Sequence, residues 1–373
     1  MQRGLFRWAG ILMLGLAVAC GEPSLDESRE AGAQEASGPQ SPSTDGNGVP
    51  GVLPPEARSV AEQQQGLASP NALTPMVTES GFITLSVDGL GTAATAGVVD
   101  VQKPAGATVR RAFLAAVSTG GSQFQIPNGN VRIDGQLVSW GRSVQSSIRS
   151  WNHFAEVTAL VKAKLDAAPA GRVTFTVTET STATIDGEVL AVIFDSPGET
   201  TVNTAILLFG AQSTTGDTFN ISLAEPINKN DPNLALDLSL GISFGFQAGN
   251  NPETQRSTVD VNGARLTSQA GGQDDGTNAN GALVTVGGLD DSNANPNPQA
   301  GGPGPRTDDE LYDLKPFVAQ GARQIAINTF NASNDDNIFF AALSLRSAAA
   351  VVGEGIVLGP TQATGEVGTA HTV

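Results

Sequence analysis

The feature that most restricts the fold of this chain is a set of short segments in which apolar and polar residues alternate. They stop at turn-forming Gly, Ser, Asn or Asp residues, and the clearest ones span residues 82–87, 111–117, 131–140, 172–179 and 188–194. Alternation with a period of two puts one set of side chains on each face of a strand. Asp134-Gly135, within the third segment, is typical of a two-residue hairpin turn. The pattern predicts an all-β body made of short antiparallel strands.

One segment has a helical period instead. In residues 155–165, apolar side chains recur at the spacing of one helix face, at Val157, Leu160, Val161 and Leu165. We therefore expect a short helix between the strand segments of this region.

The order of elements repeats in the second part of the chain. A hairpin with a D/N-G turn, a short amphipathic segment and a pair of strands occur at residues 131–138, 154–161 and 173–194, and again at 259–266, 310–318 and 325–345. A chance match is the alternative, since such hairpins are common in β-proteins. We expect two tandem antiparallel β-sandwiches, jelly-roll-like and with one short helix each, over residues 78–205 and 206–350.

The N-terminal segment predicts export. Arg3 and Arg7 precede an uncharged apolar run over residues 8–19, which is too short to span a hydrocarbon core of about 30 Å. The run ends in Ala-Val-Ala before Cys20, the only cysteine, and this resembles the lipobox of bacterial lipoproteins. The resemblance implies a signal peptide over residues 1–19, acylation of Cys20, and a place on the outer membrane of a Gram-negative bacterium, exposed at the cell surface. An ordinary signal peptide with an incidental cysteine is the alternative.

The segment after the lipobox has a different composition. Residues 20–77 are rich in Pro, Gly, Ser and Glu and contain almost no periodic apolar pattern. Such a segment buries too little apolar surface to offset the entropy of ordering it. We expect a disordered linker that joins the lipidated Cys20 to the β-body.

Charge and composition exclude several classes of partner. The chain of 373 residues has 20 Lys and Arg against 37 Asp and Glu, a formal charge of −17, so we expect no nucleic-acid binding. Its single Cys and two His leave almost nothing for a zinc or haem site. Residues 46–51 have G-x-G-x-x-G spacing but lie in the expected linker, so we expect no nucleotide site either.

Paired acids in Gly- and Asn-rich loops are the candidate metal ligands. Residues 291–297 read D-S-N-A-N-P-N, which alternates oxygen-bearing side chains as calcium loops do. The Gly and the terminal Glu of an EF-hand loop are missing. If calcium binds, the first ligands to consider are Asp290, Asp291, Asn293, Asp308 and Asp309. Solvated surface acids are the alternative.

The sequence contains only weak matches to catalytic motifs. Ser243 lies in G-I-S-F-G, yet this motif sits in an alternating segment and the only later histidine is His371. His153 stands alone beside Trp151, where a packing role is the simpler interpretation. Paired acids also permit a glycosidase hypothesis, although aromatic residues for sugar stacking are scarce. We expect a protein that is not an enzyme, with a secreted hydrolase as a lesser alternative.

A wider resemblance points to bacterial surface proteins. The segments RAFLAAV, VRIDG, FAEVTALV and GEVLAVIF, followed by GQDDG, DDELYDL and NDDNIFFAALSL, resemble uncharacterised β-sandwich domains of large secreted surface proteins over about residues 80–348. Residues 351–373 read as a linker and an incomplete strand, because 358–373 resemble the start of an invasin/intimin-type bacterial Ig-like domain. This implies that the chain is a fragment of a longer protein.

The combined expectation is a cell-surface lipoprotein with a non-catalytic adhesion or surface-structural role. It would contact the membrane through its lipid anchor and bind a glycan or a protein surface. The alternative is a carbohydrate-binding module stabilised by calcium.

Overall fold

Several antiparallel β-sheets form the part of the chain that this computed structural model describes. The described residues are 71–91, 94–213, 216–243, 257–271, 284–293, 310–331 and 336–346, and all lie in one compact unit, Arg58–Val373. They contain one α-helix, which is short. The expected all-β class is therefore confirmed. The signal peptide, Cys20, most of the expected linker and residues 351–373 lie outside the described residues.

The first half of the body, β2 to β10, consists of two sheets. The first inner sheet has the order β2 (Ile83–Leu90), β10 (Ile185–Asp195), β4 (Thr108–Ser118), β8 (Trp151–Glu156) and β7 (Arg142–Gln145). The first outer sheet has the order β3 (Ala96–Lys103), β9 (Gly171–Glu179), β5 (Val131–Ile133) and β6 (Gln136–Leu137). Helix α2 (Thr158–Ala167) links β8 to β9 and buries Val161 and Leu165.

The second half, β11 to β19, also consists of two sheets. The second inner sheet has the order β1 (Thr74–Gly81), β11 (Asn203–Phe209), β19 (Asn337–Arg346), β13 (Ala235–Ser243) and β16 (Val284–Val286), with β17 (Leu311–Asp313) also paired to β13. The second outer sheet has the order β12 (Asp217–Ser222), β18 (Gln324–Phe330), β14 (Ser257–Val261) and β15 (Ala264–Ala270). A 3₁₀ turn, η1 (Lys315–Phe317), precedes β18.

The two halves have matching strand orders. The order β2-β10-β4-β8 in the first inner sheet corresponds to β11-β19-β13-β17 in the second. The order β3-β9-β5-β6 in the first outer sheet corresponds to β12-β18-β14-β15 in the second. Along the chain, α2 and η1 occupy the same place in the succession of elements. The repeated order of elements in the sequence thus has a counterpart in the strand pairing.

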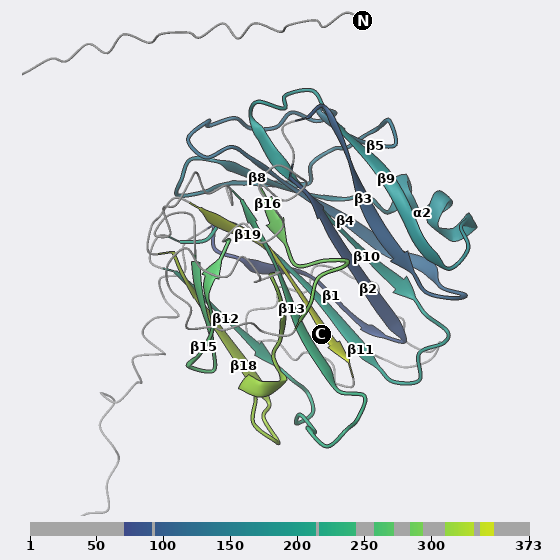
Figure 1. Cartoon of the computed structure of the whole chain (residues 1–373), viewed down its shortest axis with the longest axis vertical. Helices are drawn as coiled ribbons and strands as arrows, with labels where there is room; N and C mark the ends of the chain where they lie inside the picture. Colours follow the sequence, from purple (N-terminus) through teal and green to yellow (C-terminus); the bar gives the residue numbers. More distant parts are fainter. Residues whose placement is uncertain are drawn as a thin grey trace, which may run out of the picture. The chain divides into compact units, whose positions relative to one another are not determined.

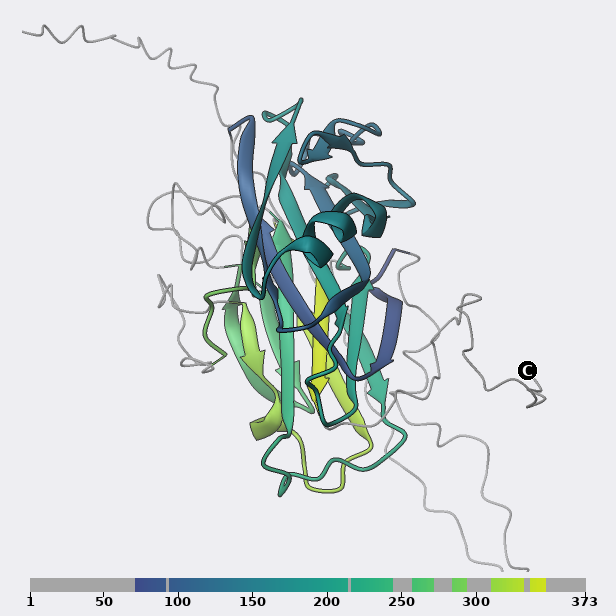
Figure 2. The same ribbon diagram turned by 90° about the vertical axis from the view of Figure 1, so that its right-hand side faces the viewer.

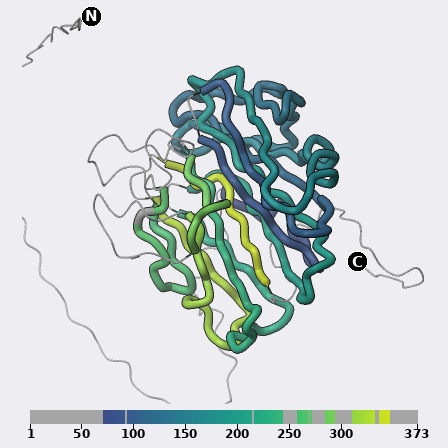
Figure 3. The backbone as a smooth tube through the Cα atoms, turned by 45° about the vertical axis from the view of Figure 1, so that its right-hand side comes forward, coloured from purple at the N-terminus to yellow at the C-terminus, as the bar shows by residue number. Residues whose placement is uncertain are grey.

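Three apolar cores separate the four sheets into layers (Figures 1 and 2). The first core lies between the first outer and first inner sheets and includes Phe175 and Leu114. The middle core lies between the two inner sheets and includes Phe113 and Leu207. Because β10 and β11 contact a core on both faces, almost all of their residues are buried and their apolar runs do not alternate. In Figure 3 most of the first half (purple to teal) and the later strands of the second half (green to yellow) lie in separate zones.

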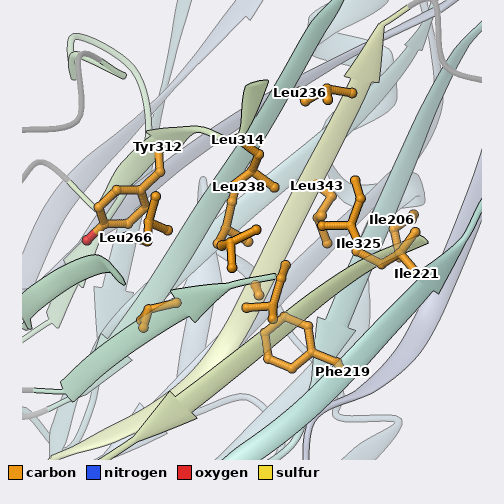
Figure 4. Packing of buried hydrophobic residues seen from close by; sticks show 14 of the residues in the cluster. Ile206, Phe219, Ile221, Leu236, Leu238, Leu266, Tyr312, Leu314, Ile325 and Leu343 are labelled. Atoms are coloured by element: carbon orange, nitrogen blue, oxygen red, sulfur yellow. The ribbon is translucent and has the colours of Figure 1, made fainter. Parts of the chain in front are cut away.

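The third core lies between the second inner and second outer sheets. Leu236, Leu238 and Leu343 reach it from the inner sheet, and Phe219 and Ile325 reach it from the outer sheet (Figure 4). Tyr312, the only tyrosine of the chain, is fully buried in the same core. Each half therefore has a core of its own in addition to the core that the halves share.

Strand β1 connects the two halves. It precedes the first half in the sequence, but it pairs with β11 at the edge of the second inner sheet, from Thr74 opposite Phe209 to Gly81 opposite Asn203. After Phe82 the chain continues as β2 in the first inner sheet. β1 begins before residue 78, where the first sandwich was expected to start. The expected boundary between residues 205 and 206 falls inside β11.

The two expected hairpins are present. Asp134-Gly135 joins β5 to β6 with φ of +46° and +78°, and Asn262-Gly263 joins β14 to β15 with φ of +50° and +79°. Two successive positive φ angles define the type I′ turn, whose twist matches that of paired strands. The sequence therefore located both turns correctly.

The helices differ from the expectation. The helix expected over residues 155–165 begins at Thr158, because 151–156 form β8 paired with β4. In the second half, the described part of residues 310–318 forms β17 and the single 3₁₀ turn η1, not an α-helix. Pro316 at the start of η1 lacks the N–H that a longer helix needs.

Candidate ligand-binding groove

A groove of about 350 Å³ opens where the two inner sheets end. The first half contributes residues 84–87 of β2 together with Gln102 and Pro104. The second half contributes side chains of β13, β17 and β19 and the loop residues 287–289. The volume lies in the range of small-ligand sites, which are concave and combine apolar walls with a few polar groups. Both halves are needed to form this groove.

On β13 and β19, the side chains that face the first half change from apolar in the middle core to polar at the groove. On β13, Leu236, Leu238 and Leu240 point into the third core, so Asp237 and Ser239 between them point toward the first half. Ser344 of β19 lies directly opposite Asp237. The inner faces that bury apolar residues in the middle core thus become polar at this end. These polar side chains line the groove together with residues of the first half.

The loop at residues 287–293 forms one wall of the groove and joins the halves. The backbone N–H of Leu289 donates to the carbonyl oxygen of Val87 on β2 at 3.1 Å. Ser239 Oγ donates to the Gly287 carbonyl oxygen. A Cβ at Gly288 would lie 2.8 Å from the Val87 carbonyl oxygen, so only glycine lets the two backbones approach this closely.

The described residues that line the groove include one acid, Asp237. Its pKa is raised, first by burial and then by Asp313, which lies directly opposite on β17. Asn293 Nδ2 donates to Asp237 Oδ1 at 2.8 Å, and this hydrogen bond opposes the increase. A carboxylate, its cross-strand neighbour and an amide therefore meet beside the groove.

The acids expected to bind calcium have separate partners. Asp290 forms an ion pair with Arg172 of the first half at 2.5 Å, and this contact lowers the pKa of Asp290. Asp291 Oδ2 accepts a hydrogen bond from the Gly288 backbone N–H at 2.6 Å. Asn293 contacts Asp237, as described above. Asp308 and Asp309 lie outside the described residues.

Within the described ranges, no group of three or more His, Cys, Asp or Glu side chains is arranged to hold a metal ion. Calcium binding at the expected residues therefore stays a prediction.

A second cluster of acids lies inside the first half, and the sequence analysis did not identify it. Glu179 of β9 and Asp186 and Glu188 of β10 are all buried, with at most 5% of each residue exposed. Gly187 lets β10 pass the edge of β2, because a Cβ there would lie 1.9 Å from the Leu90 carbonyl oxygen. The only available signal was two acids at the start of a long apolar run, residues 185–194.

Burial controls the charge of these acids. It raises the pKa of Glu179 to about 8 and that of Asp186 to about 7, and it raises the pKa of Glu188 well above its usual value. The carboxyls of Glu179 and Glu188 interact electrostatically, and none of their four oxygens has a hydrogen-bond partner among the described residues. Two carboxylates cannot donate, so this pair is satisfied only when one of them carries a proton. Thr119 Oγ1 donates to Asp186 at 2.7 Å.

His153 has a packing role, as its isolation in the sequence suggested. It lies on β8 with 0% of its surface exposed, and burial lowers its pKa to about 4. Its Nε2 accepts from the Ile126 backbone N–H at 3.0 Å, and Nδ1 lies 2.8 Å from Ser143 Oγ. The neutral ring is thus held by hydrogen bonds on both nitrogens, and Nε2 is not available to take a proton.

Ser243 ends β13 and is buried, with its Oγ directed at the Asn337 carbonyl oxygen at 3.4 Å. A nucleophile elbow instead exposes its serine on a turn between a strand and a helix.

The chain was also compared with known proteins. Neither the protein-family models nor the curated proteins gave a match. In the part of the chain that is described, none of the helices has the length and apolar character required to cross a bilayer.

Proposed function

We propose that the chain is a cell-surface lipoprotein with a non-catalytic adhesion or surface-structural role, and that its ligand contact is the groove between the two halves. The observation that carries this proposal is that both halves build one groove with polar side chains on otherwise apolar inner faces. Lipidated Cys20 would attach the protein to the outer membrane of a Gram-negative bacterium, with residues 20–70 as part of the tether.

The strand orders support a finer description of the fold. Eight strands of each half match the order of a jelly roll, in two four-stranded sets; β7 adds a further strand to the first half, and β16 and β1 add strands to the second. We propose two such sandwiches, related by duplication of one unit and joined through the middle core. Jelly rolls are common in lectins, which agrees with a binding role but does not by itself assign one.

A glycan or a short protein segment is the class of ligand that suits the groove. Ser86, Gln102, Ser239 and Ser344 supply hydroxyl and amide groups, and Leu85 and Leu311 supply apolar surface. Neutral hydrogen-bonding groups of this kind recognise hydroxyl-rich or backbone-like ligands. The volume accommodates a small saccharide unit or a few residues of a peptide.

Filling the groove tests the binding role. In the mature chain without lipid, Ser344→Tyr places a ring in the groove, and Thr176→Tyr places the same ring on the exposed face of β9 as a control. We expect Ser344→Tyr to reduce binding to cells or to a glycan array at least about tenfold, which corresponds to 1.4 kcal/mol. The proposal is wrong if the parent chain binds no cell, glycan or matrix preparation, or if both variants bind equally well. Turnover of a glycan by the parent would contradict the non-catalytic role.

The anchor is tested in cells. Cys20→Ser removes the thiol that would be acylated, so we expect the variant protein to move from the membrane fraction to the soluble fraction and to lose labelling by a fatty-acid analogue. Protease added to intact cells should cleave the parent if it is exposed. Unchanged membrane attachment of the variant would exclude lipidation at Cys20.

Calcium stabilisation is a second candidate, and the meeting of Asp237, Asp313 and Asn293 favours it. Calcium binds oxygen ligands, and a cation there would relieve the repulsion of the two acids. A ligand present at 100 times its Kd adds about 2.7 kcal/mol, so millimolar calcium after EDTA should raise Tm. Asp237→Asn should remove the shift, whereas Asp260→Asn, in the β14–β15 hairpin, should retain it. An unchanged Tm would leave these acids without a metal role.

A further inference from the structure

The chain enters and leaves the second inner sheet at opposite ends. β1 begins with Thr74 opposite Phe209, and Phe209 lies opposite Phe340 on β19. β1 ends with Gly81 opposite Asn203, and Asn203 lies opposite Arg346 at the end of β19. Since both strands are antiparallel to β11, β1 and β19 run parallel, with β11 between them (Figure 1). Residues 1–70 precede one end of this trio and residues 347–373 follow the other.

This geometry determines how a pulling force acts on the sheet. A pull on residues before Thr74 and after Arg346 draws β1 and β19 in opposite directions along the strand axis. The hydrogen bonds of both ladders then lie across the force and are loaded together. A pull applied to two points at one end of a sheet instead opens the bonds one after another. Breaking many bonds in one step needs a larger force than breaking them in sequence.

Other contacts hold β1 along its length. Val77 is buried in the middle core, and Ser80 Oγ lies 2.8 Å from Thr204 Oγ1 on β11. Glu79 forms ion pairs with Arg110 at 3.4 Å and Arg111 at 3.2 Å, both on β4 of the first half. β1 is therefore attached to both halves, so sliding it requires that backbone hydrogen bonds, core packing and ion pairs all be lost.

Contacts also extend beyond the N-terminal end of β1. The Asn71 carbonyl oxygen accepts from the Ala211 backbone N–H at 2.7 Å, and Asn71 Nδ2 donates to the Gln145 carbonyl oxygen at 3.0 Å. These bonds lie where a tether would first transmit force. They add to the ladder instead of leaving a frayed end from which β1 is easily peeled.

We propose that β1, β11 and β19 form a load-bearing clamp that resists tension between the membrane-side tether and whatever follows β19. This inference rests on the proposed function, because tension arises only if the chain is anchored at one end and held at the other. The mechanical property itself belongs to the described strands. It can therefore be measured on the isolated protein without a membrane or a ligand.

The experiment is single-molecule force spectroscopy on the mature, non-lipidated chain in two pulling directions. Cys20 and an added Val373→Cys give handles on both sides of the trio. The control uses Cys20→Ser with Phe82→Cys and Val373→Cys, which loads the trio from the end where Gly81 and Arg346 lie. Phe82 is 54% exposed, so the substitution leaves the core intact.

We expect the first geometry to unfold at about twice the force of the second or more at one loading rate, because forced unfolding is governed by the unfolding barrier. Equal forces in the two directions would overturn the proposal.

A matched pair of variants locates the barrier. Val77→Ala shortens a side chain of β1, and Val177→Ala makes the same change in the first core, on β9. If the clamp sets the barrier, Val77→Ala lowers the first unfolding force in the Cys20–Val373→Cys geometry and Val177→Ala does not, although both reduce equilibrium stability. The reverse pattern would overturn the proposal. Loss of adhesion with an intact force difference would instead count against the proposed function alone.

Discussion

The two halves share a strand order but differ at one end of their cores. In the first half, Val131 of β5 pairs with Glu179 of β9. In the second half, Val259 of β14 pairs with Thr329 of β18. Glu188 stands two residues after Asp186, and Ile338 stands two residues after Asp336. The corresponding strand positions thus hold the carboxyl pair of Glu179 and Glu188 in the first half. In the second half they hold the hydroxyl of Thr329 and the aliphatic side chain of Ile338.

The difference shows that the strand pairing does not require the carboxyl pair of Glu179 and Glu188. The second half forms the same two sheets with Thr329 and Ile338 in the corresponding places. The acids of the first half instead make its stability depend on pH. Burial, the interactions among the three acids and the hydrogen bond from Thr119 determine their pKa values. No basic side chain among the described residues contributes.

The largest expected effect is the pH dependence of the first half. The pKa of Glu179 rises on folding from 4.5 to about 8, so the stability of the protonated pair is fully present below pH 4.5 and is lost as the pH rises through 8. At about 1.4 kcal/mol per pKa unit, the loss reaches several kcal/mol. Urea unfolding between pH 4.5 and 9, followed by the fluorescence of Trp140 and Trp151 in the first half, measures it.

Two substitutions sharpen this comparison: one removes an acid from the pair in the first half, and the other places an acid at the corresponding position of the second half. Glu188→Gln keeps the shape of the pair without a second ionisable carboxyl, so the pH dependence should become shallower. Thr329→Glu adds a further buried acid to the second half, which already buries Asp336 and Glu310, and the variant should lose more stability toward high pH than the parent. If Glu188→Gln unfolds with the same pH profile as the parent, the carboxyl pair is not the source of the dependence.

The next effect concerns how strongly the middle core couples the unfolding of the two halves. Leu238→Ala creates a cavity in the third core, at a cost of about 2–5 kcal/mol. All tryptophans after residue 19 lie in the first half. If the middle core couples the halves, the tryptophan transition should shift to lower urea although the substitution is in the second half. A tryptophan transition that stays in place would mean that the halves unfold independently.

The smallest expected effect is the loss of stability when a hairpin glycine is replaced, and this loss should be equal in the two halves. Gly135 and Gly263 have φ of +78° and +79° in their hairpin turns, and a Cβ at either position meets no atom within 4 Å. Gly→Ala at each site should therefore cost only the backbone strain, about 1–2 kcal/mol. Thermal unfolding of the two variants compares them directly. Clearly unequal losses would show that the hairpins contribute differently to the two halves.

Local features of the fold were predictable from the sequence. The two D/N-G turns and the alternating segment 172–179 depend on neighbouring residues, and they lie where the pattern placed them. The start of the helix was placed too early, because the pairing of β8 with β4 overrides local helical spacing. The apolar segment of β11 could have indicated a strand buried on both faces, since it does not alternate.

Features that depend on long-range contacts were not predictable. Nothing local in residues 74–81 shows that they pair with β11 and not with the strands of the first half. The groove is lined by residues between 84 and 104 of the first half and between 237 and 344 of the second, so its residues share no motif. Asn293 was a candidate ligand from loop composition, but its neighbours Asp237 and Asp313 come from separate strands.

The pairing of β1 with β11 has a consequence for the order of events during synthesis. Residues 74–81 leave the ribosome before any residue of the first half, yet their partner, residues 203–209, appears only after the first half is complete. β1 must therefore wait with Val77 exposed, and β11 presents an open apolar edge until β1 arrives. Contacts of such long sequence separation form slowly. The pairing of β1 with β11 thus has to wait for the whole first half, and a factor that shields β1 until residues 203–209 appear would have a defined time in which to act.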